Sequence, residues 1–179
     1  MSSPLPSGDN PPKLAILVSF SGQGGVERMI ANLSHALIAQ GVSLDILLIK
    51  NRGPHSKGLP SGARTIELGS RHTATSILPL SRYLRREKPD ALLAVKHRGI
   101  IAALRARALA GTDTPIAGRL GTTVSVPLAS SSWLKRGLWF RAMRRFYPKL
   151  CSVVAVSDGV AEDIATITGL TPPQLRVIR

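Results

Sequence analysis

Short, continuously apolar runs alternate with amphipathic segments along the chain from Lys13 onward. The apolar runs are typical of strands buried on both faces of a parallel sheet. They lie at 13–20, 43–49, 64–68, 90–95, 115–120, 151–156 and 175–178. Between them, apolar residues that recur every three or four positions predict helices. These helices lie at 26–40, 76–87, 99–109, 133–147 and after 157. The alternation predicts an α/β fold: a Rossmann-like open parallel sheet with helices on both faces.

Prolines and glycines set the boundaries of these elements. Residues 1–12 contain four prolines and little apolar content, which predicts a disordered tail before a single domain over 13–179. Gly41 stands where the first helix needs a left-handed C-terminal cap. Pro89 and Pro148 end two further helices, because the residue before a proline disfavours helical geometry.

Composition supports one folded domain and adds a strong charge bias. The 179 residues are 44% hydrophobic, enough for a core of this size, and carry a net charge of +14. Residues 82–149 alone hold 15 basic and 3 acidic groups. An excess this concentrated predicts an anionic partner: a phosphorylated substrate, an anionic membrane surface or nucleic acid. The single cysteine, Cys151, excludes an internal disulfide, and the chain has no signal-peptide pattern, so we expect a cytoplasmic protein.

In an open parallel sheet, ligands bind beyond the carboxyl ends of the strands, so the segments after the strands are candidate sites. Glycines let a phosphate approach the backbone closely, and cations and hydroxyls bind phosphate or sugar oxygens. The candidate residues are Gly24, Gly25, Lys96, His97, Arg98, Arg119, Gly121, Thr122 and Ser157. The alternatives are a structural tight turn for the glycines, solvated loop charge for the cations and a helix cap for Ser157. His97, whose ordinary pKa is near neutrality, is a possible general base or an exposed loop histidine.

The segment from Trp133 to Lys149 predicts an amphipathic helix with aromatic residues on one side. Its cations are candidates for contact with anionic lipid: Lys135, Arg136, Arg141, Arg144 and Arg145. The alternative is an ordinary crossover helix that packs its apolar side on the sheet. Burial of both Trp133 and Trp139 would exclude docking through the apolar side.

Two other functions fit the residues less well. A nicotinamide-dependent enzyme would need the spacing GxGxxG, which Gly25-Val26-Glu27 breaks, and Asp45 is its candidate for ribose recognition. A non-enzymatic anion-binding module, including a basic nucleic-acid binder, is the main alternative. Nucleic acid is disfavoured, because the aromatics gather on one helix and are not spread along a strand platform. We expect no metal site.

Three segments together resemble the N-terminal domain of a GT-B glycosyltransferase of family 4. They are GGVERMIANLSHALIAQG, LRREKPDALLAV and VVAVSDGVAEDI followed by LRVIR. The resemblance implies a retaining enzyme that transfers a sugar from a nucleotide-diphosphate sugar to an acceptor, such as a lipid-linked glycan or lipopolysaccharide. It also implies that Gly24 and Gly25 face the cleft between two domains.

The resemblance has two further consequences. Many family members have a histidine that contacts the donor sugar where this chain has Gly121. The nucleotide is held mainly by a C-terminal domain, whose motifs the 179 residues do not include. We therefore expect an acceptor-side half that transfers sugar at a negligible rate alone, needs no cofactor, and sits in the cytoplasm or on the inner face of the membrane.

Overall fold

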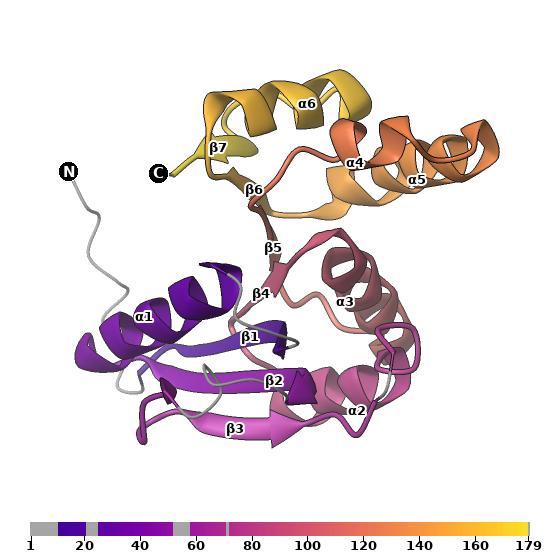
Figure 1. The fold of residues 1–179 in the computed structure, drawn as a ribbon. Coiled ribbons are helices and arrows are strands. Elements are labelled where there is room, and N and C mark those ends of the chain that lie inside the picture. The colour runs from indigo at the N-terminus through magenta and orange to yellow at the C-terminus, as the bar shows by residue number, and fades with distance from the viewer. Residues whose placement is uncertain (1–10, 21–24, 52–57, 71, 179) are drawn as a thin grey trace.

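A computed structural model describes residues 11–20, 25–51, 58–70 and 72–178. Its seven strands form one parallel sheet in the order β3-β2-β1-β4-β5-β6-β7 (Figure 1). The strands are β1 (Lys13–Phe20), β2 (Ser43–Asn51), β3 (Arg64–Glu67), β4 (Ala91–Val95), β5 (Ile116–Leu120), β6 (Ser152–Ala155) and β7 (Leu175–Val177). Every pairing is parallel, which confirms the predicted α/β sheet.

Six helices connect the strands. They are α1 (Gly25–Ala39), α2 (Ile77–Glu87), α3 (His97–Ala110), α4 (Ser125–Ala129), α5 (Trp133–Phe146) and α6 (Asp158–Thr168). The short α4 was not predicted, since five residues are too few to show a period. The predicted tail falls largely on residues 1–10, which lie outside the described residues.

The two faces of the sheet are covered unequally. Helices α2, α3, α5 and α6 pack on one face, in a core that includes Leu17, Ile100 and Met143. Helix α1 packs on the other face against β1 and β2, around Ile16 and Ile30 (Figure 1). Buried apolar area of this extent is the main stabilising term of the fold.

Glycine is required at two turns and one strand of this framework. Gly41 has φ +77° after α1 and Gly111 has φ +64° after α3, as left-handed helix caps demand. On β5, a Cβ at Gly118 would lie 2.8 Å from Cδ1 of Ile100. The missing side chain therefore lets α3 approach the sheet closely.

The start of α3 corrects one prediction. The pattern predicted a helix from Gly99, with Lys96, His97 and Arg98 in a preceding loop. The helix begins at His97 instead, and Lys96 is its N-cap with φ 64° and ψ 147°. The turn from β4 into α3 is thus a single residue, so His97 and Arg98 are held by a helix.

Candidate functional site

Two cavities lie side by side at the carboxyl edge of the sheet. The first, of about 460 Å³, lies between the segment before α2, the start of α3 and the side of α5. The second, of about 450 Å³, lies over the ends of β1, β4 and β5. Both are lined by Ser19, Thr73, His97, Arg98 and Trp139. They form a continuous candidate site around the first turn of α3.

The second cavity brings together several of the predicted residues. Lys96, His97, Arg98, Gly121 and Thr122 all line it. The first three are the N-cap and the first two residues of α3, and the last two come from the segment after β5. The segments after β4 and β5 therefore meet in one cavity, while a binding role for these residues stays a prediction.

Of the other predicted residues that the structure describes, none lines either cavity. Gly24 is outside the described residues, and Gly25 is the exposed first residue of α1. Arg119 is half-buried, and burial lowers its pKa. Its Nη1 lies 3.2 Å from where a Cβ on Gly121 would be. Ser157 caps α6, with its hydroxyl accepting from the N–H of Val160 at 3.3 Å.

The backbone of Lys96 is strained. A φ of 64° with ψ 147° is a conformation that non-glycine residues rarely adopt, and it costs on the order of 1–3 kcal/mol. The peptide is held by its N–H, which donates to the carbonyl of Arg119 at 3.1 Å. Its Nζ lies 3.8 Å from Oε1 of the buried Glu27. Strain of this kind is concentrated at functional sites, where it fixes the direction of a side chain or a helix start.

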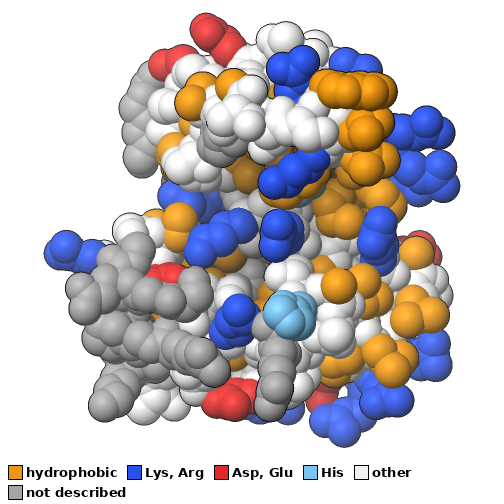
Figure 2. All heavy atoms as spheres, turned by 45° about the vertical axis from the view of Figure 1, so that its right-hand side comes forward, with side chains coloured by type: hydrophobic (Ala, Val, Ile, Leu, Met, Phe, Trp, Pro, Cys, Tyr) orange, Lys and Arg blue, Asp and Glu red, His pale blue; other side chains and the backbone are white. Residues whose placement is uncertain are grey.

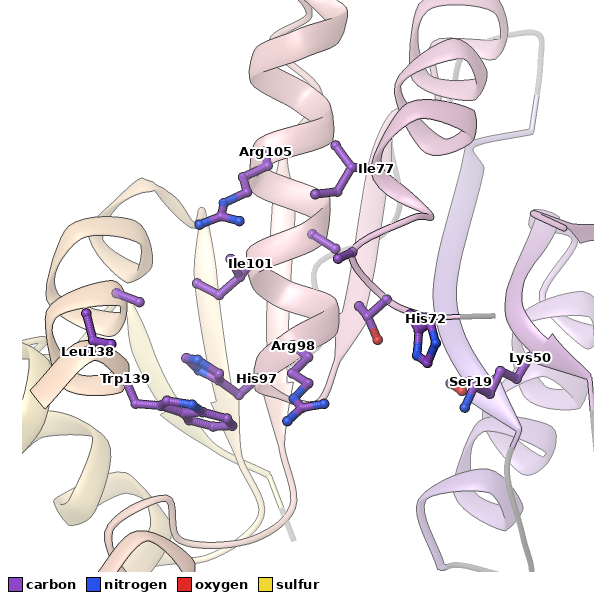
Figure 3. A pocket seen from close by; sticks show the side chains of 14 residues that line it. Ser19, Lys50, His72, Ile77, His97, Arg98, Ile101, Arg105, Leu138 and Trp139 are labelled. Carbon is purple, nitrogen blue, oxygen red and sulfur yellow. The ribbon is translucent and has the colours of Figure 1, made fainter. Parts of the chain in front are cut away.

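His97 is enclosed by two aromatic side chains. Its ring stacks on Trp139 with 4.3 Å between centroids (Figure 3). Its Nδ1 lies 3.0 Å from the hydroxyl of Tyr147. Burial, helped by the positive charge of Arg98, lowers the pKa of His97 to about 4. His97 is therefore neutral at physiological pH.

The hydrogen bond with Tyr147 also fixes which tautomer His97 adopts. The Tyr147 hydroxyl is fully buried, and burial raises its pKa, so it stays protonated. Among the described residues its hydrogen-bond partner is Nδ1 of His97, so a buried hydroxyl that needs an acceptor donates its hydrogen there. Nδ1 of His97 accepts that hydrogen, which leaves the proton of the neutral ring on Nε2. His97 thus offers a hydrogen-bond donor to the cavity, and the general-base interpretation loses its support.

The first cavity shows residues that sequence reasoning missed. Figure 3 shows Trp139 and His97 on one wall and His72, Ser19 and Lys50 on the opposite wall. Lys50 follows the buried part of β2, so the carboxyl-end rule could have found it. His72 carries no signal of its own, because its position depends on how the segment before α2 folds.

The cations of the first cavity lack acidic partners among the described residues. Arg98 and Arg105 lie over aromatic rings. Cζ of Arg98 is 5.9 Å from the centroid of the Trp139 ring, and Cζ of Arg105 is 5.4 Å from the centroid of the Phe146 ring. Together with Lys50 they give the cavity a net positive wall, while Ile77, Ile101 and Leu138 give it an apolar one. Such a lining suits an anionic group attached to an apolar or sugar-like body. Within the described ranges, no cluster of His, Cys, Asp and Glu is suited to a metal ion.

Asp45 does not belong to this site. It lies near the amino end of β2, where both of its oxygens accept hydrogen bonds from Arg64 and one also accepts from Tyr83. Since α1 begins with Gly25 after the carboxyl end of β1, Asp45 lies at the opposite edge of the sheet from a ribose bound there. The candidate for nicotinamide recognition is therefore wrong.

Comparison with known proteins gives a consistent result. The family described as Glycosyltransferase Family 4 matches residues 23–179. A search of curated proteins gave no match. Similar solved structures share the fold at low identity, and the chain spans less than half of the length of the three described next.

The first is a lipopolysaccharide outer core galactosyltransferase, WaaB, with 16% identity and a TM-score of 0.64. The alignment covers 92% of this chain and 44% of WaaB. The second is Alr3699/HepE of Anabaena in complex with UDP, with 15% identity, TM-score 0.65, and coverage of 93% and 43%. The third is sucrose-phosphate synthase of Thermosynechococcus elongatus, with 13% identity, TM-score 0.68, and coverage of 93% and 47%. These likenesses establish the fold.

Proposed function

We propose, because this chain belongs to glycosyltransferase family 4, that it forms the acceptor-side half of an enzyme that transfers a sugar from a nucleotide-diphosphate donor. The acceptor is a lipid-linked glycan or a lipopolysaccharide, and the anomeric configuration is retained. The observation that carries this proposal is the pair of cavities around the first turn of α3, where cations and hydrogen-bond donors gather beside an apolar wall.

The residues of the site have distinct roles in this proposal. Stabilising the charge of the leaving diphosphate is the main electrostatic task, and the guanidinium groups of Arg98 and Arg105 can serve it without a metal. His97 donates from Nε2 to a sugar or phosphate oxygen. Thr122, exposed at the rim of the second cavity, offers a hydroxyl to the same ligand.

A second domain completes the proposed enzyme. The chain covers 43–47% of the three solved structures described above, which is consistent with one of two similar halves. We propose that this further domain supplies most of the contacts to a nucleotide such as UDP, with which Alr3699/HepE of Anabaena forms a complex. The 179-residue chain alone should then transfer sugar at a negligible rate.

The test is a transfer assay with labelled nucleotide-diphosphate sugars and lipid-linked or lipopolysaccharide acceptors. It compares the chain alone with the chain fused to the nucleotide-binding half of a family-4 enzyme. We expect transfer only from the fusion, retained configuration by NMR, and loss of transfer in His97→Ala but not in His35→Ala. Robust turnover by the chain alone would contradict the need for a second domain. Absence of transfer from the fusion, with donor still bound, would contradict the function itself.

A further inference from the structure

Helices α4 and α5 expose an unusual group of large apolar side chains. The exposed fractions are 68% for Val126, 74% for Trp133, 57% for Leu134 and 69% for Leu138. We call these four residues the apolar tip. Figure 2 shows hydrophobic atoms gathered with Lys and Arg where the α5 side of the molecule comes forward. Scattered exposed leucines are ordinary, but four large apolar side chains within thirteen positions mark an interaction surface.

The apolar tip is not the apolar side that the sequence pattern predicted. That predicted side, with Trp139, Phe140 and Met143, packs against the core, so it is used by the fold. Leu134 and Leu138 lie one turn apart on the outward side of α5. Because Trp133 is exposed while Trp139 is half-buried, α5 can still dock on another surface, but through a different set of residues.

The charged side chains of α5 all have one sign. Lys135, Arg136, Arg141 and Arg145 are exposed and have no acidic partner among the described residues, and no acidic residue occurs in α5. Arg144 differs, because its Nε donates to the carbonyl of Ile167 at 2.9 Å and so holds α6. A surface with apolar side chains between unpaired cations is complementary to an anionic bilayer, whose phosphates lie directly above its acyl chains.

We propose that the apolar tip inserts into an anionic lipid bilayer while Lys135, Arg136, Arg141 and Arg145 bind lipid phosphates. Trp133 would lie at the interface, where tryptophan is favoured. Nucleic acid would satisfy the cations but would leave the exposed leucine side chains in water. In the part of the chain that the structure describes, no helix is long and apolar enough to cross a membrane.

The proposed surface is continuous with the candidate site. Leu138 belongs to the apolar tip and also lines the first cavity, next to Trp139. An acceptor whose lipid stays in the bilayer could therefore enter the first cavity beside Leu138 without leaving the membrane. Delivery of the acceptor from the bilayer rests on the proposed function. Bilayer binding itself needs no sugar donor, so the two proposals can fail separately.

The first test is co-sedimentation of the chain with phosphatidylcholine vesicles, with and without phosphatidylglycerol. We expect binding only when phosphatidylglycerol is present, weakening as salt rises. The variant Trp133→Ser/Leu134→Ser should bind at least about tenfold more weakly, because two apolar side chains no longer leave water. Its matched control is Leu109→Ser/Ile178→Ser, which removes two other exposed apolar side chains and should bind like the unchanged chain.

Charge is tested in the same assay. Lys135→Gln/Arg136→Gln should weaken binding about thirty-fold, since each cation near an anionic surface contributes roughly a factor of five. Arg28→Gln/Arg82→Gln removes the same charge from α1 and α2 and should have an effect of a few-fold at most. Equal binding to vesicles without phosphatidylglycerol, or equal loss in both pairs, would overturn the proposal.

Fluorescence identifies the residue that enters the bilayer. Trp133 and Trp139 are the two tryptophans of the chain, so Trp139→Phe leaves Trp133 as the reporter. We expect its emission to shift to shorter wavelength when anionic vesicles are added. An unchanged emission from a vesicle-bound chain would overturn insertion of the apolar tip, as would self-association through Trp133 without vesicle binding. Loss of sugar transfer with vesicle binding intact would count against the proposed function alone.

Discussion

The two edges of the sheet use the same kinds of charged residue in opposite ways. At the amino edge, Lys13 and Arg64 are paired with Asp45 and Glu87 over distances of 2.6–3.8 Å. At the carboxyl edge, Arg98 and Arg105 have no acidic partner in the described part of the chain, whereas Lys96 pairs with Glu27 at 3.8 Å. Paired charges at one edge stabilise the fold, while unpaired cations at the other are available to an anionic ligand.

The pKa values at the amino edge reflect this pairing. Arg64 and then Lys13 lower the pKa of Glu87 to about 2. Burial alone would raise the pKa of Asp45, but hydrogen bonds from Arg64 and Tyr83 bring it below its usual range. The pKa of Tyr83 is raised by burial and by the hydrogen bond to Asp45. The cluster therefore keeps its charges across the physiological pH range and has no group available for acid–base chemistry.

The largest effect on stability is expected from Asp45→Ala. The change leaves the Arg64 charge and the buried Tyr83 hydroxyl without their shared acceptor, which should lower the free energy of unfolding by about 3 kcal/mol. Asp113→Ala, away from this network, is the matched control and should change it by less than about 0.5 kcal/mol. Urea denaturation measures both. Equal stability of the two variants would show that the amino-edge network does not stabilise the fold.

A smaller effect is expected from pH through His97. The unfolded chain protonates this ring near pH 6.5, but the folded chain resists protonation down to about pH 4. Folding stability should therefore be intact above pH 6.5 and fall by about 2 kcal/mol as pH drops to about 5. The loss from Glu87 comes later, between about pH 4.5 and 2.

The variant His97→Asn separates the His97 effect from other titrations. Its amide oxygen can still accept from Tyr147, but it does not titrate, so the stability slope between pH 6.5 and 4 should flatten. His35→Asn, which changes an exposed histidine of α1, should keep the slope. Thermal denaturation at a series of pH values gives the comparison. A slope that survives in His97→Asn would mean that another group causes it.

Most of the fold could be predicted from the sequence, because it depends on local patterns. Apolar runs and helical periods located all seven strands and five of the six helices, within a few residues. The error at the start of α3 has a clear cause: the strained Lys96 turn is stabilised by the Arg119 carbonyl of a neighbouring strand. A contact between residues 23 positions apart leaves no local signal.

The candidate site could be predicted only in part. The rule that ligands bind at carboxyl ends pointed to the segments after β4 and β5, and the candidates from both segments line one cavity. Their binding role stays a prediction. The contribution of Trp139 depends on α5 packing against α3, which a single sequence does not determine. The pattern favoured packing for the apolar side of α5, as the structure has it, but it gave no signal for the exposed Trp133, Leu134 and Leu138.

A further prediction concerns the strain at Lys96. Lys96→Gly removes the cost of a positive φ and loses only a long, half-exposed ion pair with Glu27. The free energy of unfolding should rise by roughly 1 kcal/mol, less than the full strain because glycine also gains freedom in the unfolded chain. Sugar transfer by the fused enzyme should fall. A variant that is both less stable and fully active would show that the strain has no functional role.

The smallest effect on stability is expected from replacing Arg98 and Arg105, the unpaired cations of the first cavity. Arg98→Gln/Arg105→Gln removes two charges that make weak contacts with aromatic rings, so the free energy of unfolding should change by less than about 1 kcal/mol. The affinity of the chain for pyrophosphate, measured by calorimetry, should fall at least about tenfold, because charge-assisted hydrogen bonds are lost.

At the amino edge, Lys13→Gln/Arg64→Gln removes the same charge and should have the opposite pair of effects. Stability should fall while the pyrophosphate Kd changes little. If both pairs lowered stability equally and left the Kd unchanged, the unpaired cations at the carboxyl edge would not form an anion site, and the contrast between the two edges would reflect charge count alone.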